Sequence, residues 1–280
     1  MKYFTIKPPE RLAAYVRYFW VLEGEASADK HYIHRSMADG CAELIFHYNG
    51  IFDEMMNDNA AGQSFSSGLA GPSQRFRRFL IKQNFGIFGV YLYPFAVSQL
   101  FSLPGTDVRN QMIDLRSLLG VEANELEEKV MLATDNDRRL KIVAEFLERK
   151  LTKVKKQPPG VFESIKYIIQ TNGVTTIEEL AKQSFLSTRQ FERNFKQFSG
   201  FNPKLFSRII RFQAVLDKYG DKGKSLTEIA YECGYYDQSH FIQDFKEFSG
   251  HNPKEYFSGK AEATEWRDKI KMSDFPNSLI

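Results

Sequence analysis

Two segments of the chain, Phe191–Phe198 and Phe241–Phe248, share one pattern of hydrophobic and polar positions. In each, phenylalanines occupy the first, fifth and eighth positions, and most residues between them are polar. Residues three and four apart lie on one face of a helix, so each segment predicts a short amphipathic helix with an aromatic face. Both copies continue with Ser-Gly and then Asn-Pro-Lys. This predicts a left-handed helix end at the glycine and a new helix starting at Asn-Pro.

A shorter helix is predicted before each aromatic helix, over Thr176–Gln183 and over Ser225–Cys233. Both begin with a hydroxyl residue followed by glutamate, which is typical of a capped helix start. A tight turn then leads into the aromatic helices, which we place at Ser187–Phe198 and Asp237–Phe248. A short helix, a tight turn and a second helix make a helix-turn-helix motif. One such pattern is a weak signal, but two in tandem, joined by a capped helix over Pro203–Tyr219, are specific.

Residues before about position 118 follow a different pattern and are predicted to be rich in β-strands. Tyr15–Leu22, Leu44–Phe46 and Phe85–Pro94 are dense in β-branched, aromatic and other apolar residues, which favours strands. We interpret Arg75–Leu80 as a partner for the last of these strands. Met55–Gly71 is polar and contains many glycine, serine and asparagine residues, which predicts a long hairpin loop.

The segments Ala123–Leu132 and Asp137–Val154 have helical periodicity. The second has one apolar stripe, which predicts either packing on its own domain or contact with a second copy in a dimer. Both interpretations stay open. Lys153–Gly160 is basic and contains Pro-Pro-Gly, so we predict an interdomain linker there, followed by a helix over Val161–Gln170. The stripe consists of Leu140, Val143, Ala144, Leu147, Leu151 and Val154.

The bulk composition is that of a globular protein large enough for two domains. The chain has 280 residues, of which 42% are hydrophobic and 26% charged. No stretch reaches the roughly 18 apolar residues of a membrane span, and the first residues lack the apolar run of a signal peptide. Cys41 and Cys233 lie far apart and form neither a disulfide framework nor a Cys-x-x-Cys site, which fits a reducing cytoplasm. The net charge of +3 does not by itself indicate nucleic-acid binding.

The outward faces of the two aromatic helices supply the candidate DNA contacts, because the second helix of such a motif enters the major groove. In the first copy, Arg189, Arg193 and Lys196 form a basic stripe opposite the phenylalanines. Arginine can donate two hydrogen bonds to guanine, and lysine can neutralise a phosphate. A merely solvated helix face would carry the same charges, but the position on the second helix of a motif favours DNA contact. The predicted contacts of the first copy are Thr188, Arg189, Glu192, Arg193 and Lys196.

The second copy presents a less charged face, which suits adenine, thymine-methyl or phosphate contacts. We therefore predict that the electrostatic attraction to DNA is stronger in the first half. His240 and His251 lie near the same helix and are interpreted as packing or capping residues. The predicted contacts of the second copy are Gln238, Ser239, Ile242, Gln243 and Lys246.

With these features, the stretch Glu163–Phe257 resembles the tandem helix-turn-helix domain of the AraC/XylS transcriptional regulators. The resemblance covers about one third of the chain. It implies a monomeric DNA-binding unit whose two recognition helices enter successive major grooves, about 34 Å apart. The spacing from Arg208 to Ala214 departs from the common family pattern, so contacts by the connecting helix are not carried over. The residues that carry the resemblance are Ile229-Ala230, Cys233-Gly234-Tyr235, Ser239-His240-Phe241, Phe245-Lys246, Gly250 and Pro253, with the parallel residues of the first copy.

The N-terminal half resembles, more loosely, the cupin-like sensor region of some family members, through Asp39–Phe46, Gly71-Pro72 and Tyr93-Pro94. The resemblance implies an α+β multidomain protein, in which a β-rich cupin-like domain precedes an all-α domain with two helix-turn-helix motifs. We place the β-rich sensor domain at 1–118, a helical segment and linker at 119–160, the tandem helix-turn-helix domain at 161–258, and a C-terminal tail, with at most a short helix around Trp266, at 259–280.

Several N-terminal side chains could bind a metal, but their spacing does not favour a site. His31 and His34 are three apart and would point to opposite faces of one strand, and the His-x-His pair of a metal-binding cupin is absent. We therefore expect structural histidines, with no metal, no cofactor and no catalytic residues. Aromatic residues could line a ligand pocket, although such residues more often form a core. The metal candidates are His31, His34, Cys41 and His47, and the aromatic candidates are Trp20, Phe46, Tyr48, Tyr91 and Tyr93.

Three functions remain open, and the sequence favours the first. It is a sequence-specific, bacterial-type transcription factor in the cytoplasm, not an enzyme, controlled by an N-terminal sensor or dimerisation domain. Its expected partners are double-stranded promoter or operator DNA, a small-molecule effector, a second copy of the chain, and RNA polymerase if it activates transcription; no membrane is expected, and the ligand-binding residues stay unassigned. The first alternative is a cupin-like enzyme with an accessory helical module. The second is a non-specific nucleic-acid or protein-interaction module, which would bind scrambled DNA equally well.

Overall fold

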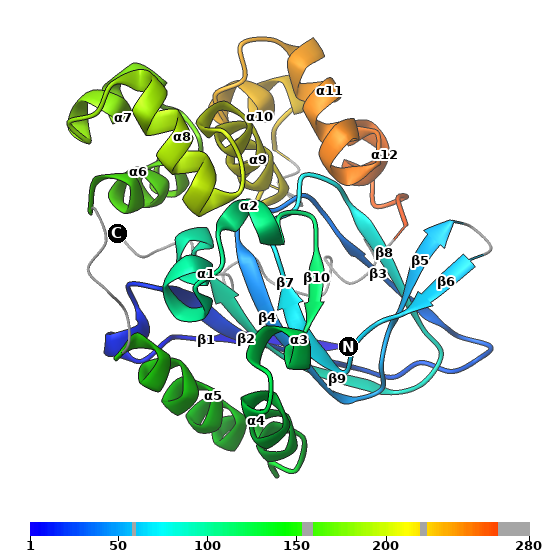
Figure 1. The fold of residues 1–280 in the computed structure, drawn as a ribbon. Helices are drawn as coiled ribbons and strands as arrows, with labels where there is room; N and C mark the ends of the chain where they lie inside the picture. Colours follow the sequence, from blue (N-terminus) through cyan, green and yellow to red (C-terminus); the bar gives the residue numbers. More distant parts are fainter. Residues whose placement is uncertain (58–59, 153–158, 219–222, 263–280) are drawn as a thin grey trace.

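The computed structural model describes residues 1–57, 60–152, 159–218 and 223–262 of the chain. The described N-terminal part holds two antiparallel sheets, and the described C-terminal part contains only helices and their connections (Figure 1). The predicted α+β fold, with a β-rich part followed by a helical one, is therefore confirmed. Among the described residues, no helix is long and apolar enough to cross a membrane.

One sheet has six strands in the order β1-β2-β9-β4-β7-β10. Successive residues of its strands face opposite sides, as the pleat requires. In β4, Leu44 and Phe46 are fully buried on one face, whereas Glu43 and Ile45 point to the other. The strands are β1 (Lys2–Ile6), β2 (Val16–Gly24), β4 (Ala42–Asn49), β7 (Ser67–Ala70), β9 (Phe85–Leu92) and β10 (Met112–Asp114).

The other sheet has four strands in the order β3-β8-β5-β6 and packs against the first. Trp20, Leu22 and Ile87 from the six-stranded sheet share one apolar cluster with Ile81 and Phe79 from the four-stranded sheet. Between the two sheets lies a cavity of about 100 Å³. The strands of the second sheet are β3 (Tyr32–Ser36), β5 (Asp53–Asn57), β6 (Ala60–Gln63) and β8 (Arg77–Ile81).

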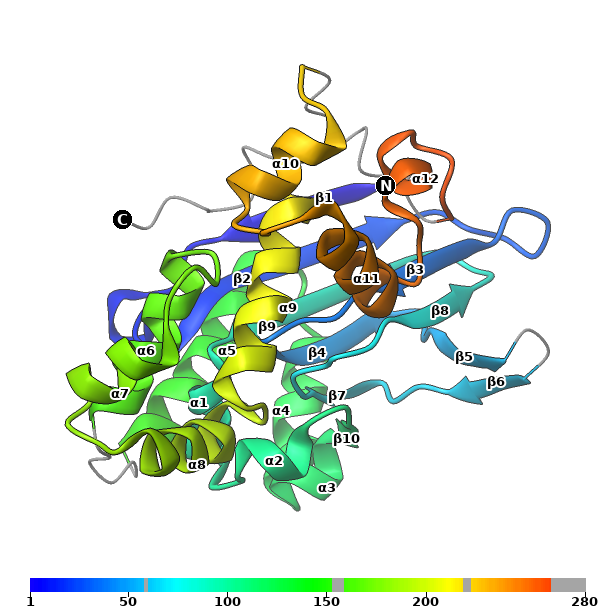
Figure 2. The same cartoon turned by 90° about the horizontal axis from the view of Figure 1, so that it is seen from above.

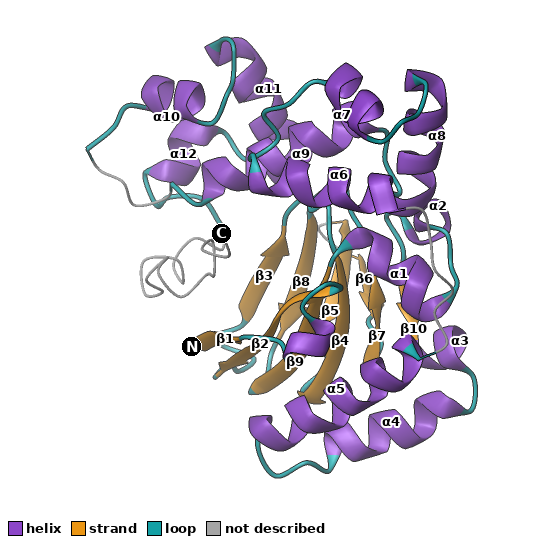
Figure 3. Ribbon diagram, turned by 90° about the vertical axis from the view of Figure 1, so that its left-hand side faces the viewer, coloured by secondary structure: helices purple, strands orange, loops and turns teal. Residues whose placement is uncertain are grey.

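Helices cover the outer face of the six-stranded sheet (Figure 3). Val143 and Leu147 of α5 are fully buried in the same cluster as Leu44 and Phe46 of β4. The apolar stripe of α5 therefore packs on its own domain, which was one of its two interpretations; Val154 of the stripe lies outside the described residues. The elements of this part are the 3-10 helix Glu10–Leu12 and helices α1 (Pro94–Phe101), α2 (Gly105–Val108), α3 (Leu115–Leu119), α4 (Glu122–Met131) and α5 (Asn136–Leu151).

Helices α6 to α12 form a layer across one end of the two sheets (Figures 1 and 3). Helix α9 runs between α6 to α8 on one side and α11 and α12 on the other (Figure 2). The phenylalanines of both repeat helices are buried in one cluster, which also contains Met37, Ala38 and Phe95 from the N-terminal part. The β-rich and helical parts thus share a core. The helices are α6 (Pro159–Gln170), α7 (Ile177–Gln183), α8 (Thr188–Ser199), α9 (Pro203–Leu216), α10 (Leu226–Glu232), α11 (Gln238–Ser249) and α12 (Pro253–Phe257).

Two strand predictions are wrong. Met55–Gly71 is not one loop, because it contains most of β5 and all of β6 and β7. Arg75–Leu80 overlaps β8, but β8 pairs with β3 and β5 rather than with β9. In the first case the polar β5–β6 hairpin lacks a hydrophobic signal, and in the second the pairing depends on residues distant in sequence.

The predicted linker and tail are only partly described. Residues 153–158 of the linker and residues 263–280 of the tail, including Trp266, lie outside the described residues. Pro159 and Gly160, which were assigned to the linker, instead begin α6. Proline is tolerated there because the first turn of a helix needs no backbone N–H from it. The boundaries of the four predicted segments stay a prediction.

Candidate nucleic-acid interface

The first helix-turn-helix motif consists of α7 and α8, and local hydrogen bonds fix both ends of α8. At its start, Ser187 Oγ accepts from the Gln190 backbone N–H (3.4 Å) and Gln190 Oε1 accepts from the Ser187 backbone N–H (3.3 Å). This is a capping box. The helix ends at Gly200, whose φ of 83° is left-handed as predicted. These ends determine which side chains of α8 face outward.

The second motif consists of α10 and α11 and has comparable caps. Ser225 and Glu228 form a capping box on α10. At the start of α11, the Asp237 carboxylate accepts from the His240 backbone N–H (2.8 Å) and contacts His240 Nδ1 (2.7 Å). The same backbone bond, followed by the side-chain bond, lowers the pKa of Asp237 below its usual value. His240 therefore belongs to the cap and His251 is buried, as predicted for both.

The two motifs differ by one residue in their turns. In each, a backbone N–H after the turn, that of Leu186 or of Tyr235, bonds to the carbonyl of an alanine in the first helix (both 3.0 Å). The preceding residue has a positive φ in both motifs, 54° at Phe185 and 79° at Gly234. Glycine adopts this conformation freely, whereas phenylalanine is strained there. Tyr236, 91% exposed, is the additional residue of the second turn.

The outward face of α8 is fully accessible. Phe191, Phe195 and Phe198 are buried, and all five predicted contacts are exposed. Within the described part of the chain, the three basic residues of this face form no ion pair. Their cationic groups are therefore available for a polyanion. The five exposed residues are Thr188, Arg189, Glu192, Arg193 and Lys196.

The outward face of α11 is accessible but less basic. Gln238, Ser239, Gln243 and Lys246 are exposed, whereas Ile242 is half-buried and packs against the core. Helix α8 carries three basic residues and one acidic one, and α11 carries one lysine and two carboxylates. The unequal attraction of the two helices to DNA stays a prediction.

An ion pair missed by the sequence reasoning holds α11 against α9. Arg208 donates to Asp244 Oδ1 through Nη2 (2.6 Å) and Nε (3.1 Å), and to Glu247 Oε2 through Nη2 (2.8 Å). Its guanidinium also lies 5.2 Å from the ring centroid of Phe248. Asp244 is only 5% exposed. A charged residue on the inner face of an amphipathic helix was the available signal for such a partner. Arg208 therefore positions α11 from within the protein.

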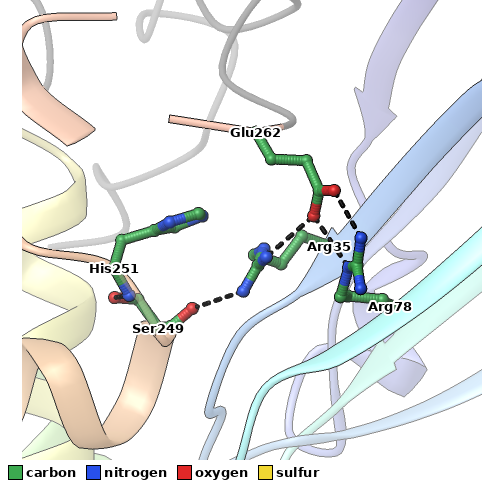
Figure 4. A network of polar contacts seen from close by, with 5 residues as sticks. All are labelled: Arg35, Arg78, Ser249, His251 and Glu262. Atoms are coloured by element: carbon green, nitrogen blue, oxygen red, sulfur yellow. Dashed lines mark hydrogen bonds and ion pairs between the residues drawn. The ribbon is translucent and has the colours of Figure 1, made fainter. Parts of the chain in front are cut away.

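Strands β3 and β8 bind the end of α11 and the segment after α12 through a cluster of charges (Figure 4). Arg35 Nη2 and Arg78 Nε donate to Glu262 Oε2 at 2.7 and 2.8 Å, and Arg78 Nη2 donates to Oε1 at 2.6 Å. Arg35 Nη1 also donates to the Ser249 carbonyl at the end of α11 (3.1 Å). Burial would raise the pKa of Glu262, but the bonds from Arg78 and Arg35 outweigh it and hold that pKa below its usual value. We call Arg35, Arg78 and Glu262 the arginine clamp.

The first motif rests on different elements of the N-terminal part. Helix α2 meets the C-terminal end of α8 so closely that a Cβ on Gly105 would lie 2.6 Å from the Phe198 carbonyl oxygen and 2.7 Å from the Gly200 nitrogen. Phe95 of α1 stacks on Phe162 of α6, with ring centroids 4.6 Å apart. The two motifs are thus attached to the N-terminal part at separate places.

The metal and pocket candidates of the N-terminal part are not brought together as one group. His34, Cys41 and His47 line the cavity between the sheets, and His31 does not. Arg17 Nη1 contacts Cys41 Sγ at 3.6 Å, and burial raises the pKa of this thiol to about 12. Among the described residues, no group of three or more His, Cys, Asp or Glu side chains is arranged to hold a metal ion. Of the predicted aromatic residues, Trp20 lines the cavity, whereas Phe46, Tyr48, Tyr91 and Tyr93 do not.

Comparisons with known proteins match both parts of the chain. Residues 180–259 match a family described as a helix-turn-helix domain, and residues 4–114 match one described as a domain of unknown function (DUF6597). Over 64 residues, the chain is 34% identical to the HTH-type transcriptional activator RhaS of Klebsiella pneumoniae (strain 342) and 36% identical to that of Salmonella arizonae. Each match covers 23% of this chain, and the chain spans only 23% of the length of these curated relatives.

Solved structures are similar over more of the chain at low identity. ToxT from Vibrio cholerae O395 is 16% identical, with 86% of this chain and 97% of that chain covered and a TM-score of 0.47. The C-terminal domain of AraT from Geobacillus stearothermophilus is 23% identical, with 40% and 93% covered and a TM-score of 0.35. The helix-turn-helix match and the RhaS relatives agree with the paired motifs seen here. Residues 180–259 therefore form a helix-turn-helix domain that is similar to that of the RhaS activators.

Proposed function

We propose that this protein is a sequence-specific DNA-binding transcription regulator. Helices α8 and α11 enter successive major grooves of one DNA site, and the β-rich domain senses a small molecule. Promoter or operator DNA is the partner of the helical domain. The protein acts in the cytoplasm and has no enzymatic activity. A second copy of the chain, and RNA polymerase where transcription is activated, are further partners.

One observation carries this proposal: each motif buries its aromatic face and leaves the opposite polar face of its second helix open. The inner faces are fixed by caps at both ends and by the shared core. The outer faces carry hydrogen-bonding and cationic side chains, which are the groups that read base edges and neutralise phosphates. A rigid helix with a free polar face is what a recognition helix requires.

The ten predicted contact residues are suited to different DNA groups on the two helices. Arg189 and Arg193 are suited to guanine edges, and Lys196 is suited to a phosphate. On α11, Gln238 and Gln243 are suited to adenine, and Ile242 offers an apolar contact to a thymine methyl group. Because the two helices are unlike and are joined in one chain, we propose an asymmetric site for each chain. The first half then supplies most of the electrostatic attraction.

In vitro selection of bound DNA from a random pool tests this proposal. We expect one enriched sequence with two unlike half-sites about one helical turn apart. The double variant Arg189→Ala, Arg193→Ala should lower affinity for that sequence by at least about thirtyfold, since each bidentate contact to a base is worth about 1–3 kcal/mol. The matched control, Arg138→Ala with Lys141→Ala, removes two exposed cations from α5 and should leave affinity unchanged.

Two results would contradict the proposal. Equal binding of the selected and scrambled sequences would indicate a non-specific module. An unchanged gel-shift titration for the double arginine variant, with its circular dichroism spectrum intact, would exclude the face of α8 as the reading surface.

A further inference from the structure

The cavity between the two sheets has a carboxylate that no cation of the described residues neutralises. Glu43 of β4 is half-buried and points into this cavity, and among the described residues its one side-chain hydrogen bond comes from Trp20. Arg77, which also lines the cavity, already pairs with Glu54 (3.5 Å) and donates to the Asn110 carbonyl. A buried carboxylate without a cationic partner is costly, because the protein interior solvates charge poorly.

A second carboxylate lies in the same cavity but has partners. Asp39 accepts hydrogen bonds from the Tyr91 hydroxyl and from the Cys41 backbone N–H (2.8 Å). The Arg17 guanidinium is also near enough to stabilise its charge. Asp39 therefore adds negative potential to the cavity while Glu43 is left to bind a ligand. Burial, together with the charge of Asp39, raises the pKa of Glu43 to about 8.

Aromatic rings surround the same space. Trp20, Phe52 and Phe79 line the cavity with Glu43. The indole of Trp20 lies across β9 to reach β4, and this requires Gly89, because a Cβ there would lie 2.1 Å from Trp20 Cε2. Aromatic faces attract cations through their quadrupole, and a carboxylate beside them supplies the countercharge. Glu43 and the three rings thus form an arrangement suited to an ammonium group.

We propose that this cavity binds a small organic cation with an ammonium group, which pairs with Glu43 and lies against the Trp20 ring. The cavity volume of about 100 Å³ limits the ligand. A cavity of about 150 Å³ is known to hold benzene, so a ligand, or the end of a ligand, of about four or five heavy atoms fits here. The inference rests on the proposed function only in treating this cation as the effector.

Pairing with a cation requires ionised Glu43, so binding releases a proton near neutral pH. The apparent affinity should rise between pH 6 and pH 8, by up to about tenfold per pH unit. The other titratable groups that line the cavity are Asp39 and Cys41, which precede β4, His47 on β4, His34 on β3 and Arg77 on β8. Burial lowers the pKa of His47, so this ring is not the group expected to lose a proton at these pH values.

The test uses the full chain and four probes of similar size: n-propylamine, tetramethylammonium, neutral 1-propanol and propionate. We expect propylamine to raise the melting temperature and to bind in calorimetry with a dissociation constant of about 1 mM or less. Tetramethylammonium should bind more weakly, because it cannot donate a hydrogen bond to Glu43. Propanol and propionate at matched ionic strength should have no effect.

Three variants separate a direct role of Glu43 from a structural one. Glu43→Gln keeps the shape of the side chain and should lower propylamine affinity by at least tenfold and abolish its pH dependence. Glu25→Gln makes the same change at an exposed position and should bind propylamine with the same affinity and pH dependence as the original protein. Gly89→Ala should also weaken binding, because it displaces the indole.

Three results would exclude binding of an organic cation in this cavity. The first two are a melting temperature that propylamine leaves unchanged, and one that propanol or propionate raises equally. The third is a Glu43→Gln variant that binds propylamine with the affinity of the original protein. These outcomes are independent of DNA. If the protein binds propylamine but selects no DNA sequence, only the proposed regulator function is contradicted. If it selects a DNA sequence but does not bind propylamine, only the proposed cation site is contradicted.

Discussion

The contribution of the arginine clamp to the free energy of unfolding can be predicted from its contacts. Glu262 accepts three N–H bonds from two guanidinium groups, and its side chain is 31% exposed while that of Arg35 is 9% exposed. A buried charge-assisted bond contributes about 1.5–3 kcal/mol, and an exposed ion pair contributes about 0–1 kcal/mol. Glu262→Gln removes the charge but keeps one acceptor oxygen. We therefore expect it to lower the free energy of unfolding by about 2 kcal/mol.

Urea unfolding followed by circular dichroism measures this loss, and Glu255→Gln on the exposed face of α12 is the matched control. A double-mutant cycle with Arg78→Gln isolates the pair itself. We expect a coupling energy of at least about 1 kcal/mol between positions 78 and 262. If the two substitutions add to within about 0.3–0.5 kcal/mol, the bidentate contact contributes nothing and the reasoning is refuted.

The pH dependence of the clamp has a definite sign. The folded-state pKa of Glu262 is lowered, so its contribution is present above the unfolded pKa and is lost as the pH falls through the folded value. The stability difference between the original protein and Glu262→Gln should therefore be constant near neutral pH and shrink below about pH 4.5. A difference that grew on acidification would contradict the ion pair.

Three further substitutions test the helical domain. Phe185→Gly should raise the free energy of unfolding by up to about 1 kcal/mol in urea titrations, since it relieves a left-handed phenylalanine that is 96% exposed; a loss of stability would show that the turn is not strained. Asp244→Ala should cost about 2 kcal/mol and weaken binding of the selected DNA, whereas a purely structural role would leave DNA affinity intact in the folded variant. Phe195→Ala, at a fully buried position, should cost about 3–5 kcal/mol, and a melting temperature close to that of the original protein would contradict the shared core.

The sequence predicted the helices of the two motifs to within a few residues, because their signals are local. Ser187 and Asp237 cap helices α8 and α11 through residues only three positions away. Gly200 and Gly250 end them in the left-handed conformation. Such signals depend on residues within one turn, so they can be read without knowing the rest of the fold.

The β-rich part was less predictable because its order depends on distant residues. Strand β3, with the sequence Tyr-Ile-His-Arg-Ser, was not predicted, although it lines the cavity and carries Arg35. Arg35 and Glu262 are 227 positions apart, and Glu262 lies in a tail to which the sequence assigned little structure. Glu43 entered only as part of a family resemblance, since nothing in its neighbourhood marks it as unpaired. Only the fold shows that Glu43 points into the cavity between the two sheets.

The segment that follows β3 connects the cavity to the second motif. Ser36, Met37 and Asp39 line the cavity. Between them, the Ala38 backbone N–H donates to the Phe248 carbonyl of α11 (3.0 Å), and the Ala38 carbonyl accepts from the Gln213 side chain of α9.

Among the described residues, the hydrogen bonds from this segment to the helical domain reach α11 and α9, and none reaches the first motif. The first motif instead rests on α1 and α2, at Phe95 and Gly105. A ligand that displaced the segment from Ser36 to Asp39 would therefore move α11 relative to α8, because of these two helices only α11 is hydrogen-bonded to it within the described part of the chain. Since two recognition helices must match successive grooves at a fixed separation, a small relative shift is sufficient to change DNA affinity. The unequal attachment of the two motifs thus gives the cavity a physical route to the proposed DNA-binding surface.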